Sequence, residues 1–320
     1  MLKIYFTVDV EIGVDGWDDI DNNFNDSFQR YIYGRTRKGN YGLPYTLNVL
    51  NDYGLTGVFF VEALFALHFG SEPLSEITGL IMEKKQPVEL HIHTEWLDEA
   101  KTPLFPHIKD KRPYLSCFAR NEQKVLIGMG KNLLNKANVQ HINAFRAGSF
   151  GFNLDTLSAL KQNEIFVDSS YNASQLGSES GLMPTGKILT EPTCYNGICE
   201  APITVFFDRP GHLRHTQLCA CSTRELEGVL WKALEEGRQE IVILSHSFEL
   251  LDKTRTRPNP VVIKRFHKLC EFLSKNSDCF SVNEFSDFSC NNSQEQPEPL
   301  VSQPWKTGLR ILEQSWSSFI

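Results

Sequence analysis

The stretch Ile4-Tyr5-Phe6-Thr7-Val8-Asp9-Val10-Glu11 decides how this chain is interpreted, because an apolar run leads directly into two acidic residues. An apolar run of this length is typical of a β-strand. A second stretch, Val88-Glu89-Leu90-His91-Ile92-His93, ends in two histidines in the same way. Side chains two residues apart on a strand point to the same face. Each stretch therefore directs two metal ligands or proton carriers to one side, which suits a divalent metal with a carboxylate nearby.

Strand-like runs of this kind alternate with segments of helical period along most of the chain. This alternation predicts an α/β domain with a parallel sheet, closed into a barrel or left open and doubly wound. The predicted strands are 2–9, 56–61, 87–93, 141–146, 164–168, 201–207, 241–246 and 279–282. The predicted helices are 43–53, 74–85, 121–137, 154–162, 223–236 and 260–274, the fifth preceded by a capping-box pattern at Ser222 and Glu225.

Five polar residues favour the barrel over the open sheet. Each of them falls at the C-terminal end of a different predicted strand, and active sites of α/β barrels are built at that end. They are Asp9, His93, Arg146, Asp168 and His246. We therefore predict a distorted (β/α) barrel of about seven strands.

Several segments do not fit the alternation. Residues 12–42 are acidic, aromatic and Gly-rich, which predicts a long loop beside the substrate groove. Residues 201–221 predict one strand followed by a loop over 208–217, where His212 and His215 are more typical of a groove or surface than of a metal site. The predicted domains are a catalytic domain at 1–290, a polar linker at 291–304 and an amphipathic helix at 305–320. This helix is expected to dock on its own domain, with a second subunit or a membrane surface as alternatives.

Composition excludes some functions. The net charge is −7 and the basic residues are dispersed, which argues against nucleic-acid binding. No stretch approaches the ~20 apolar residues of a membrane helix, and the first residues lead into a predicted strand without a signal-peptide pattern, so a cytoplasmic location is expected. Eight cysteines without zinc-ribbon spacing predict reduced thiols.

Six motifs in order resemble those of the polysaccharide deacetylases, the NodB-homology or carbohydrate esterase 4 family. The resemblance spans residues 4 to about 285 and implies a distorted (β/α) barrel and carbohydrate N-deacetylation. The motifs are Thr7-Val8-Asp9-Val10-Glu11, Thr56-Gly57-Val58-Phe59-Phe60, Glu89-Leu90-His91-Ile92-His93-Thr94, Phe145-Arg146-Ala147-Gly148-Ser149-Phe150, Asp168-Ser169-Ser170 and Ile243-Leu244-Ser245-His246.

The resemblance implies a role for each matched residue. Asp9 would be the general base and His246 the general acid. Arg146 would orient the base, and Asp168 would support the acid. Glu11 and His93 would bind the metal, expected to be Zn²⁺, with Co²⁺, Ni²⁺, Mn²⁺ or Fe²⁺ as alternatives. The predicted substrate-binding residues are Thr94, Phe150, Arg214 and His215.

This chain departs from the family's pattern at three motifs. The opening motif is Asp-Val-Glu, and the third motif has Ala-Gly-Ser-Phe after its arginine. The position of the family's second metal histidine, four residues after His93, is Leu97, which cannot bind a metal. His91 lies on the same strand face as His93 and offers a replacement, so the predicted metal ligands are Glu11, His91 and His93.

The predicted function is metal-dependent removal of N-acetyl groups from an amino sugar within a saccharide or saccharide–lipid intermediate. A role in surface polysaccharide biosynthesis fits the expected cytoplasmic location. One alternative is another amide hydrolase of the same scaffold, such as one acting on allantoin-like cyclic amides, some of which dispense with the metal. The other is a sugar-binding relative without turnover.

Overall fold

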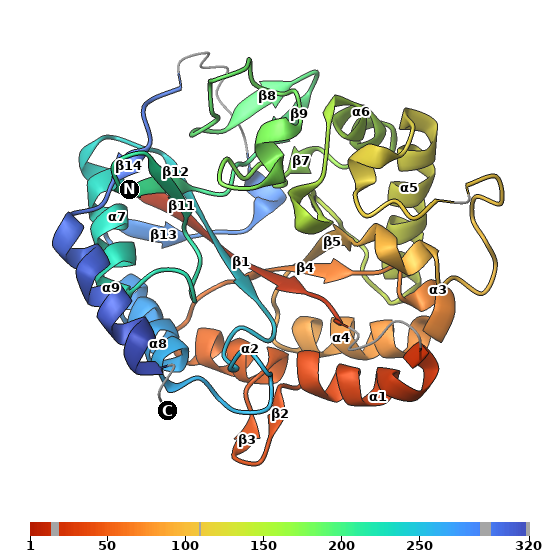
Figure 1. Cartoon of the computed structure of the whole chain (residues 1–320), viewed down its shortest axis with the longest axis horizontal. Coiled ribbons are helices and arrows are strands. Elements are labelled where there is room, and N and C mark those ends of the chain that lie inside the picture. The colour runs from red at the N-terminus through yellow and green to blue at the C-terminus, as the bar shows by residue number, and fades with distance from the viewer. Residues whose placement is uncertain (14–18, 109, 289–295, 318–320) are drawn as a thin grey trace. The chain divides into compact units, whose positions relative to one another are not determined.

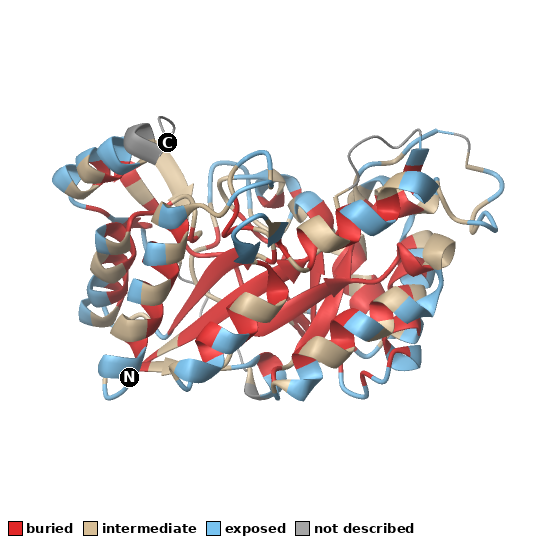
Figure 2. Ribbon diagram, turned by 90° about the horizontal axis from the view of Figure 1, so that it is seen from below, coloured by how far each residue is buried: buried red, intermediate tan, exposed pale blue. Residues whose placement is uncertain are grey.

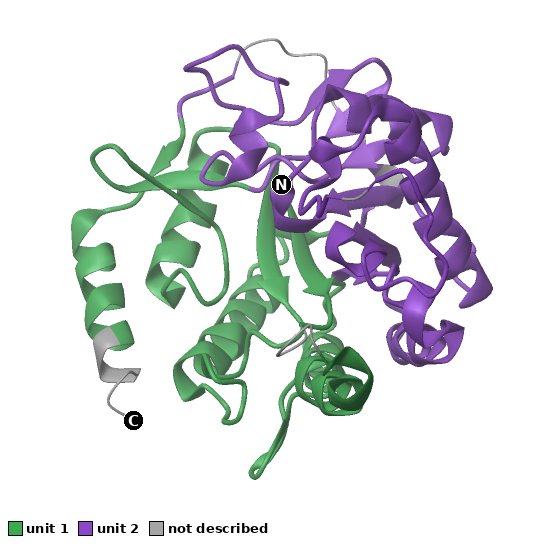
Figure 3. Cartoon of the chain, turned by 45° about the vertical axis from the view of Figure 1, so that its right-hand side comes forward, with its two compact units in different colours: residues 1–57, 204–283, 299–320 green, residues 58–203, 284–298 purple. Residues whose placement is uncertain are grey.

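The computed structural model describes residues 1–13, 19–108, 110–288 and 296–317. The chain divides into two compact units, which are coloured separately in Figure 3. Unit 1 comprises residues 1–57, 204–283 and 299–320, and unit 2 comprises residues 58–203 and 284–298. Each unit combines parallel strands with helices, in agreement with the predicted strand–helix alternation.

The sheet of unit 1 is built around β1 (Leu2–Val10). Strand β1 pairs in parallel with β12 (Glu240–His246) from Lys3 to Asp9, and with β13 (Phe280–Val282) near its start. Every residue of β1 except Lys3 is buried. The one polar side chain inside the apolar run, Thr7, donates its hydroxyl hydrogen to the carbonyl of Ile243 at 2.9 Å. The opening sequence therefore forms a buried parallel strand that brings Asp9 to the end of the sheet.

Four α-helices of unit 1 present apolar faces to its interior, and helices in Figure 2 are red on one side and pale blue on the other. They are α1 (Ile20–Tyr31), α2 (Leu43–Asp52), α7 (Thr223–Glu235) and α8 (Pro260–Lys275). The fifth, α9 (Pro304–Ser317), buries Thr307 and Arg310, while Trp305, Ile311 and Leu312 are exposed. At the start of α7 the Ser222 hydroxyl accepts the N–H of Glu225, and the Glu225 carboxylate accepts the N–H of Ser222. The predicted capping box is thus confirmed.

The prediction of one long loop over residues 12–42 is wrong. Residues 20–31 form α1, and β2 (Arg35–Thr36) and β3 (Gly39–Asn40) form a short antiparallel pair. The buried residues of α1 recur at helical spacing, which the surrounding acidic and amide residues obscured: Ile20, Phe24, Ser27, Phe28 and Tyr31. Residues 14–18 of the predicted loop lie outside the described residues.

The prediction of a single strand and a loop at 201–221 is also wrong. Strand β10 (Val205–Arg209) turns back into β11 (His212–His215), so most of 208–217 belongs to an antiparallel hairpin. Gly211 has a φ of 71° in the turn between them, where glycine carries no Cβ penalty. Strand β14 (Leu300–Val301) pairs in parallel with β10.

Helix α9 packs on unit 1 through buried charges. Arg310 donates hydrogen bonds to Asp208 at 2.8 Å and to Glu225 at 3.0 Å. Arg265 of α8 donates to Glu313 at 2.9 Å. The C-terminal segment is therefore a helix that contacts β10, α7 and α8 of its own chain. Among the helices that the structure describes, none is long and apolar enough to cross a membrane.

The strands of unit 2 follow the order β4-β5-β6-β7-β9-β8, and most of them are labelled in Figure 1. All neighbours are parallel except β8, which runs antiparallel to β9. The strands are β4 (Val58–Glu62), β5 (Val88–Ile92), β6 (Ala144–Ala147), β7 (Val167–Asp168), β9 (Ile198–Glu200) and β8 (Thr193–Tyr195). The α-helices of this unit are α3 (Ala66–Phe69), α4 (Ser71–Glu83), α5 (Arg120–Lys136) and α6 (Leu154–Gln162).

The hairpin of β8 and β9 was not predicted from the sequence. It contains a cysteine whose oxidation state differs from the prediction. Cys199 on β9 is disulfide-bonded, so the expectation of reduced thiols is wrong at this position. Six other cysteines are free thiols: Cys117, Cys194, Cys219, Cys221, Cys270 and Cys279.

Candidate active site

The predicted base and acid are direct neighbours in unit 1. Asp9 and His246 are register partners at the C-terminal ends of the parallel strands β1 and β12. The N–H of Ser247 donates to the carbonyl of Asp9 at 2.9 Å, which continues the pairing by one residue. Asp9 is 3% exposed and the side chain of His246 is 22% exposed. A buried carboxylate therefore lies beside an imidazole that solvent or substrate can reach.

Glu249 orients His246 from the turn that follows β12. Its carboxylate accepts the N–H of His246 at 2.9 Å and the N–H of Cys219 at 2.7 Å. The nearer carboxylate oxygen also lies 4.0 Å from Nδ1 of His246. Glu249 thus fixes the backbone of His246 and lies close to its ring. No role for Glu249 was predicted, because it follows the motif by three residues.

A chain of two further side chains reaches Nδ1 of His246. The amide nitrogen of Gln217 lies 3.3 Å from this atom, and Nε2 of His215 lies 2.7 Å from the amide oxygen of Gln217. An amide nitrogen only donates, so Nδ1 of the neutral His246 ring accepts and its hydrogen sits on Nε2. Burial lowers the pKa of His215, which favours its neutral form. His215 thus has a partner within the protein, and its predicted contact with substrate stays a prediction.

Arg214, the other predicted sugar contact on this hairpin, has a partner within the protein as well. Its Nε donates to Asp208 at 2.8 Å, and Asp208 also accepts from Arg310 of α9. The guanidinium is 21% exposed, so part of it faces outward. Its contact with substrate stays a prediction.

The two predicted metal histidines lie together in unit 2. His91 is the fourth residue of β5, and His93 follows the end of that strand. Their ring centroids are 4.9 Å apart, and a nitrogen of one ring lies within 4.8 Å of a nitrogen of the other. Nδ1 of His91 lies 2.8 Å from the carbonyl oxygen of Arg146. Since a carbonyl only accepts, Nδ1 carries the hydrogen and Nε2 of His91 keeps its lone pair for a metal.

Two acidic residues hold His93 in place. The carboxylate of Glu62, at the end of β4, accepts the N–H of His93 and the N–H of Leu64. Burial raises the pKa of Glu62 to about 8. Glu95 lies 3.4 Å from Nδ1 of His93. Glu62 was not identified from the sequence, although an acid that closes the apolar run Val58-Phe59-Phe60-Val61 is itself a signal.

Arg146 and two buried acids form a second polar cluster in unit 2. Arg146 is fully buried, and its guanidinium donates to the carbonyl and hydroxyl oxygens of Ser169 at 2.9 and 3.0 Å. Asp168 on β7 and Glu200 on β9 are register partners, and both are fully buried. The Asp168 carboxylate accepts the hydroxyl hydrogen of Ser170.

Burial sets the protonation of this acid pair. It raises the pKa of Asp168 to about 6, and it raises the pKa of Glu200 well above its usual value, with the charge of Asp168 as a second cause. Two carboxyl groups that share a hydrogen bond cannot both ionise without cost. The pair therefore holds a proton.

The turn Gly148–Phe150 follows β6 and has an unusual backbone. Ser149 and Phe150 have φ values of 51° and 59°, in the left-handed region that costs an L-residue about 1–2 kcal/mol. Two such residues in succession are maintained only where the surrounding structure fixes them, and they concentrate at functional sites. Phe150 is half-buried. Its contact with substrate stays a prediction.

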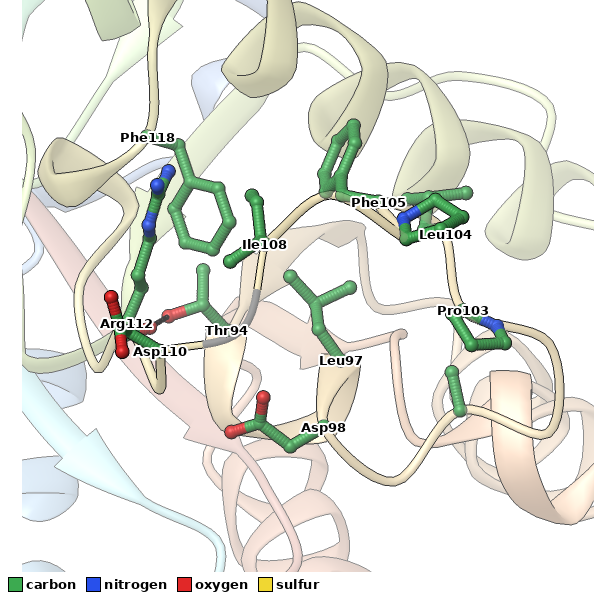
Figure 4. A pocket seen from close by; sticks show the side chains of 12 residues that line it. Thr94, Leu97, Asp98, Pro103, Leu104, Phe105, Ile108, Asp110, Arg112 and Phe118 are labelled. Carbon is green, nitrogen blue, oxygen red and sulfur yellow. Dashed lines mark hydrogen bonds between the residues drawn. The ribbon is translucent and has the colours of Figure 1, made fainter.

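A cavity of about 270 Å³ lies in the segment that follows His93 (Figure 4). Leu97, at the position of the missing metal histidine, lines this cavity. Thr94 also lines it, and its hydroxyl donates to the carbonyl of Arg112 at 2.8 Å. The other lining residues are Asp98, Ala100, Pro103, Leu104, Phe105, Pro106, Ile108, Asp110, Arg112 and Phe118.

No family model and no curated protein sequence matches the chain. A solved structure of a provisionally named polysaccharide deacetylase from Mycobacterium smegmatis matches it with a TM-score of 0.52 at 16% identity, covering 90% of this chain and 95% of the other. The chain has the fold of the polysaccharide deacetylases. The predicted fold class, a NodB-like (β/α) barrel, is thereby confirmed over the doubly wound sheet.

Another solved structure shares part of this arrangement. A 4-α-glucanotransferase from Thermococcus litoralis has a TM-score of 0.54 at 11% identity, and the match covers 94% of this chain but 42% of the other. The deacetylase fold accounts for nearly the whole length of both chains in its own match. At such identities the likeness concerns the fold, so activity has to be argued from the residues.

Within the deacetylase fold, the predicted site residues divide between the units. Unit 1 holds the predicted base, acid, one metal ligand and two sugar contacts: Asp9, His246, Glu11, Arg214 and His215. Unit 2 holds the predicted metal histidines, Arg146, Asp168, Thr94 and Phe150. The supporting residues that the sequence did not reveal are Glu62, Glu200, Gln217 and Glu249.

Proposed function

We propose that this protein is a metal-dependent hydrolase that removes N-acetyl groups from an amino sugar. The observation that supports this most directly is the pairing of Asp9 with His246 on adjacent parallel strands. Amide hydrolysis at neutral pH needs a base for the water and an acid for the departing amine. A carboxylate and an imidazole that end neighbouring strands can serve both needs from one edge of the sheet.

The metal ligands in this proposal are Glu11, His91 and His93. The donor set fits a divalent ion, because His91 already donates Nδ1–H to Arg146 and so offers Nε2. Glu11 belongs to unit 1 and the histidines to unit 2, so its inclusion rests on the sequence pattern. When bound, Zn²⁺, or Co²⁺, Ni²⁺, Mn²⁺ or Fe²⁺, would polarise the acetyl carbonyl and lower the pKa of a water to about 7.

The protein's own groups then move the protons. Asp9 takes a proton from the water whose oxygen attacks the acetyl carbon. A backbone N–H in the Gly148–Phe150 turn stabilises the oxyanion. His246 gives a proton to the amide nitrogen as the C–N bond breaks, which yields acetate and the free amino sugar. Arg146 orients Asp9, and Asp168 supports His246, as the resemblance implies.

The substrate in this proposal is a saccharide or saccharide–lipid intermediate, with surface polysaccharide biosynthesis as its setting. Thr94, Phe150, Arg214 and His215 are proposed to contact the sugar. This setting rests on the expectation of a cytoplasmic location.

Release of acetate from N-acetylated sugars, measured together with bound metal, tests the proposal. Wild type loaded with Zn²⁺ should release acetate, and His246→Ala should lower turnover by about 10²–10⁴-fold with metal content unchanged, because it removes the proton donor. His141→Ala removes an exposed histidine of unit 2 and should match wild type.

Three other results would contradict the proposal. Unchanged turnover in His246→Ala would reject the assignment of the acid. Sugar binding without acetate release would favour a binding protein that lacks turnover. Hydrolysis of cyclic ureides alone would favour the allantoinase-like alternative. This alternative stays open because Leu97 occupies the position of the family's second metal histidine.

A further inference from the structure

Arg255, in the segment after β12 and within unit 1, carries a charge that the proposed chemistry does not use. Among the described residues, its guanidinium makes no hydrogen bond or ion pair, and its Nε is buried without a partner. A buried donor without a partner destabilises the folded protein unless a ligand supplies the acceptor. A guanidinium offers five donors in a planar fork that matches carboxylate and phosphate groups.

Two aromatic rings hold the Arg255 guanidinium in place. Its central carbon lies 4.5 Å from the ring centroid of Tyr31 and 4.5 Å from that of Phe248. The two rings meet edge to face, with centroids 5.0 Å apart. Stacking of this kind orients a guanidinium without using its N–H donors. The side chain is therefore positioned before any ligand arrives.

Arg255 lies in a turn whose backbone is held by local hydrogen bonds to Asp252. Arg255 has a φ of 54°, a left-handed conformation that is uncommon for a residue with a Cβ. The Asp252 carboxylate accepts the hydroxyl hydrogen of Thr254 and the N–H groups of Thr256 and Arg257. Because Asp252 makes these local bonds, the turn fixes the direction of Arg255 without neutralising it.

Phe248 places this arginine beside the proposed acid. The Phe248 ring contacts both groups, since its centroid also lies 5.4 Å from the ring of His246. Glu249, which follows Phe248 in the sequence, already accepts the N–H groups of His246 and Cys219. Arg255 and His246 contact the same aromatic ring, so an anion bound by Arg255 would lie in the same part of unit 1 as the proposed acid.

We propose that Arg255 binds an anionic group of the substrate, a phosphate or a carboxylate carried by the acetylated amino sugar. This inference rests on the proposed function and narrows its substrate to an acidic sugar derivative. Both groups present the planar or tetrahedral oxygens that a guanidinium binds through two N–H donors. The binding experiment described next distinguishes a phosphate from a carboxylate.

Calorimetric binding to the full Zn²⁺-loaded chain tests the proposal. The probes are N-acetylglucosamine, N-acetylglucosamine 1-phosphate and N-acetylmuramic acid, which are neutral, phosphorylated and carboxylated. At least one charged sugar should bind about tenfold more tightly than the neutral one, and inorganic phosphate should compete with it. Arg255→Gln should remove this preference, and Arg255→Lys should keep part of it. Arg257→Gln removes an equal charge from an exposed position in the same turn and should keep all of it.

The outcomes separate this inference from the function on which it rests. Equal or absent binding of the charged sugars, or a preference that survives in Arg255→Gln, overturns the inference. An equal loss in Arg257→Gln also overturns it, because the preference would then reflect general charge. The Arg255→Lys variant keeps the test valid if Arg255→Gln is unstable. Arg255-dependent binding without acetate release supports the inference and rejects the deacetylase function.

Discussion

At the scale of single residues, the proposed acid His246 is positioned by neighbours that lie outside its motif. Glu249 fixes its backbone N–H and lies 4.0 Å from its ring, while Gln217 contacts Nδ1 at 3.3 Å. These contacts leave Nε2 as the atom that can deliver a proton. A substitution of Glu249 or Gln217 can therefore change the position of His246 while the imidazole that donates the proton stays present.

Glu249→Gln should lower kcat by about tenfold with KM and metal content nearly unchanged. The variant removes the negative charge 4.0 Å from Nδ1 of His246 and disturbs the carboxylate that holds its backbone N–H, and a displaced proton donor lowers turnover more than binding. Steady-state kinetics at several pH values measure the change. Glu235→Gln, an exposed acid on α7, is the matched control. An unchanged kcat would show that Glu249 serves stability alone.

Glu200→Gln should flatten the dependence of stability on pH. Burial raises the pKa of Asp168 from 3.8 to about 6 and raises the pKa of Glu200 well above its usual value, so the folded state keeps a proton that the unfolded state releases. Stability from this pair is fully present below about pH 4 and is lost as pH rises toward and beyond 6, by about 1.4 kcal/mol per pH unit and proton.

Urea denaturation at pH 4.5, 5.5 and 6.5 measures this slope. In Glu200→Gln, Asp168 loses its like-charged neighbour, so the free energy of unfolding should fall less steeply than in wild type. Glu179→Gln, which removes an exposed acid from the same unit, should keep the wild-type slope. Glu62 and Glu89 also have raised pKa values, but they contribute equally to all three proteins. Identical slopes would rule out a shared proton.

Sequence patterns pointed to the residues with proposed chemical roles more readily than to the residues that contact them. Asp9 and His246 lie at the ends of apolar runs, and strand ends of this kind can be recognised from the sequence alone. Glu200 pairs with Asp168 across strands that are distant in sequence, and no local pattern reveals that register. Gln217 precedes His246 by 29 residues, so its contact depends on the isolated bridge between its backbone and β12.

At the scale of elements, long apolar runs were predicted more reliably than mixed segments. The run before Asp9 forms β1, since nearly all of its side chains are buried. Helix α1 was missed because only every third or fourth residue is apolar and amide and acidic residues make up most of the rest. The β10–β11 hairpin was missed because charged strand residues at a turn resemble a loop.

Arg310→Ala should destabilise the protein by about 3 kcal/mol, because it withdraws a buried cation from Asp208 and Glu225. All three side chains are at most 6% exposed. Lys306→Ala changes a partly exposed cation on the same helix and should cost less than about 1 kcal/mol. Urea denaturation compares the two variants. A cost below 1 kcal/mol for Arg310→Ala would show that α9 contributes little to the stability of unit 1.

At the scale of the whole molecule, the chain leaves unit 1 after residue 57 and returns to it at residue 204. This path places Glu11 and the two metal histidines in different units. The sequence showed one run of alternating elements and gave no sign of the division. Compactness depends on contacts between distant segments, which local patterns do not encode.

The proposed metal set can be tested on the whole chain without assuming how the units are placed. If one ion takes Glu11 from unit 1 and His91 from unit 2, then Glu11→Gln and His91→Ala should each weaken Zn²⁺ binding by at least about tenfold from one ion per chain. Zn²⁺ at 100 times its Kd should stabilise wild type by about 2.7 kcal/mol, and both variants by less at that concentration. His107→Ala, at an exposed histidine of unit 2, should bind like wild type. Wild-type affinity in Glu11→Gln would remove Glu11 from the ligand set and leave the two histidines to hold the ion with another ligand.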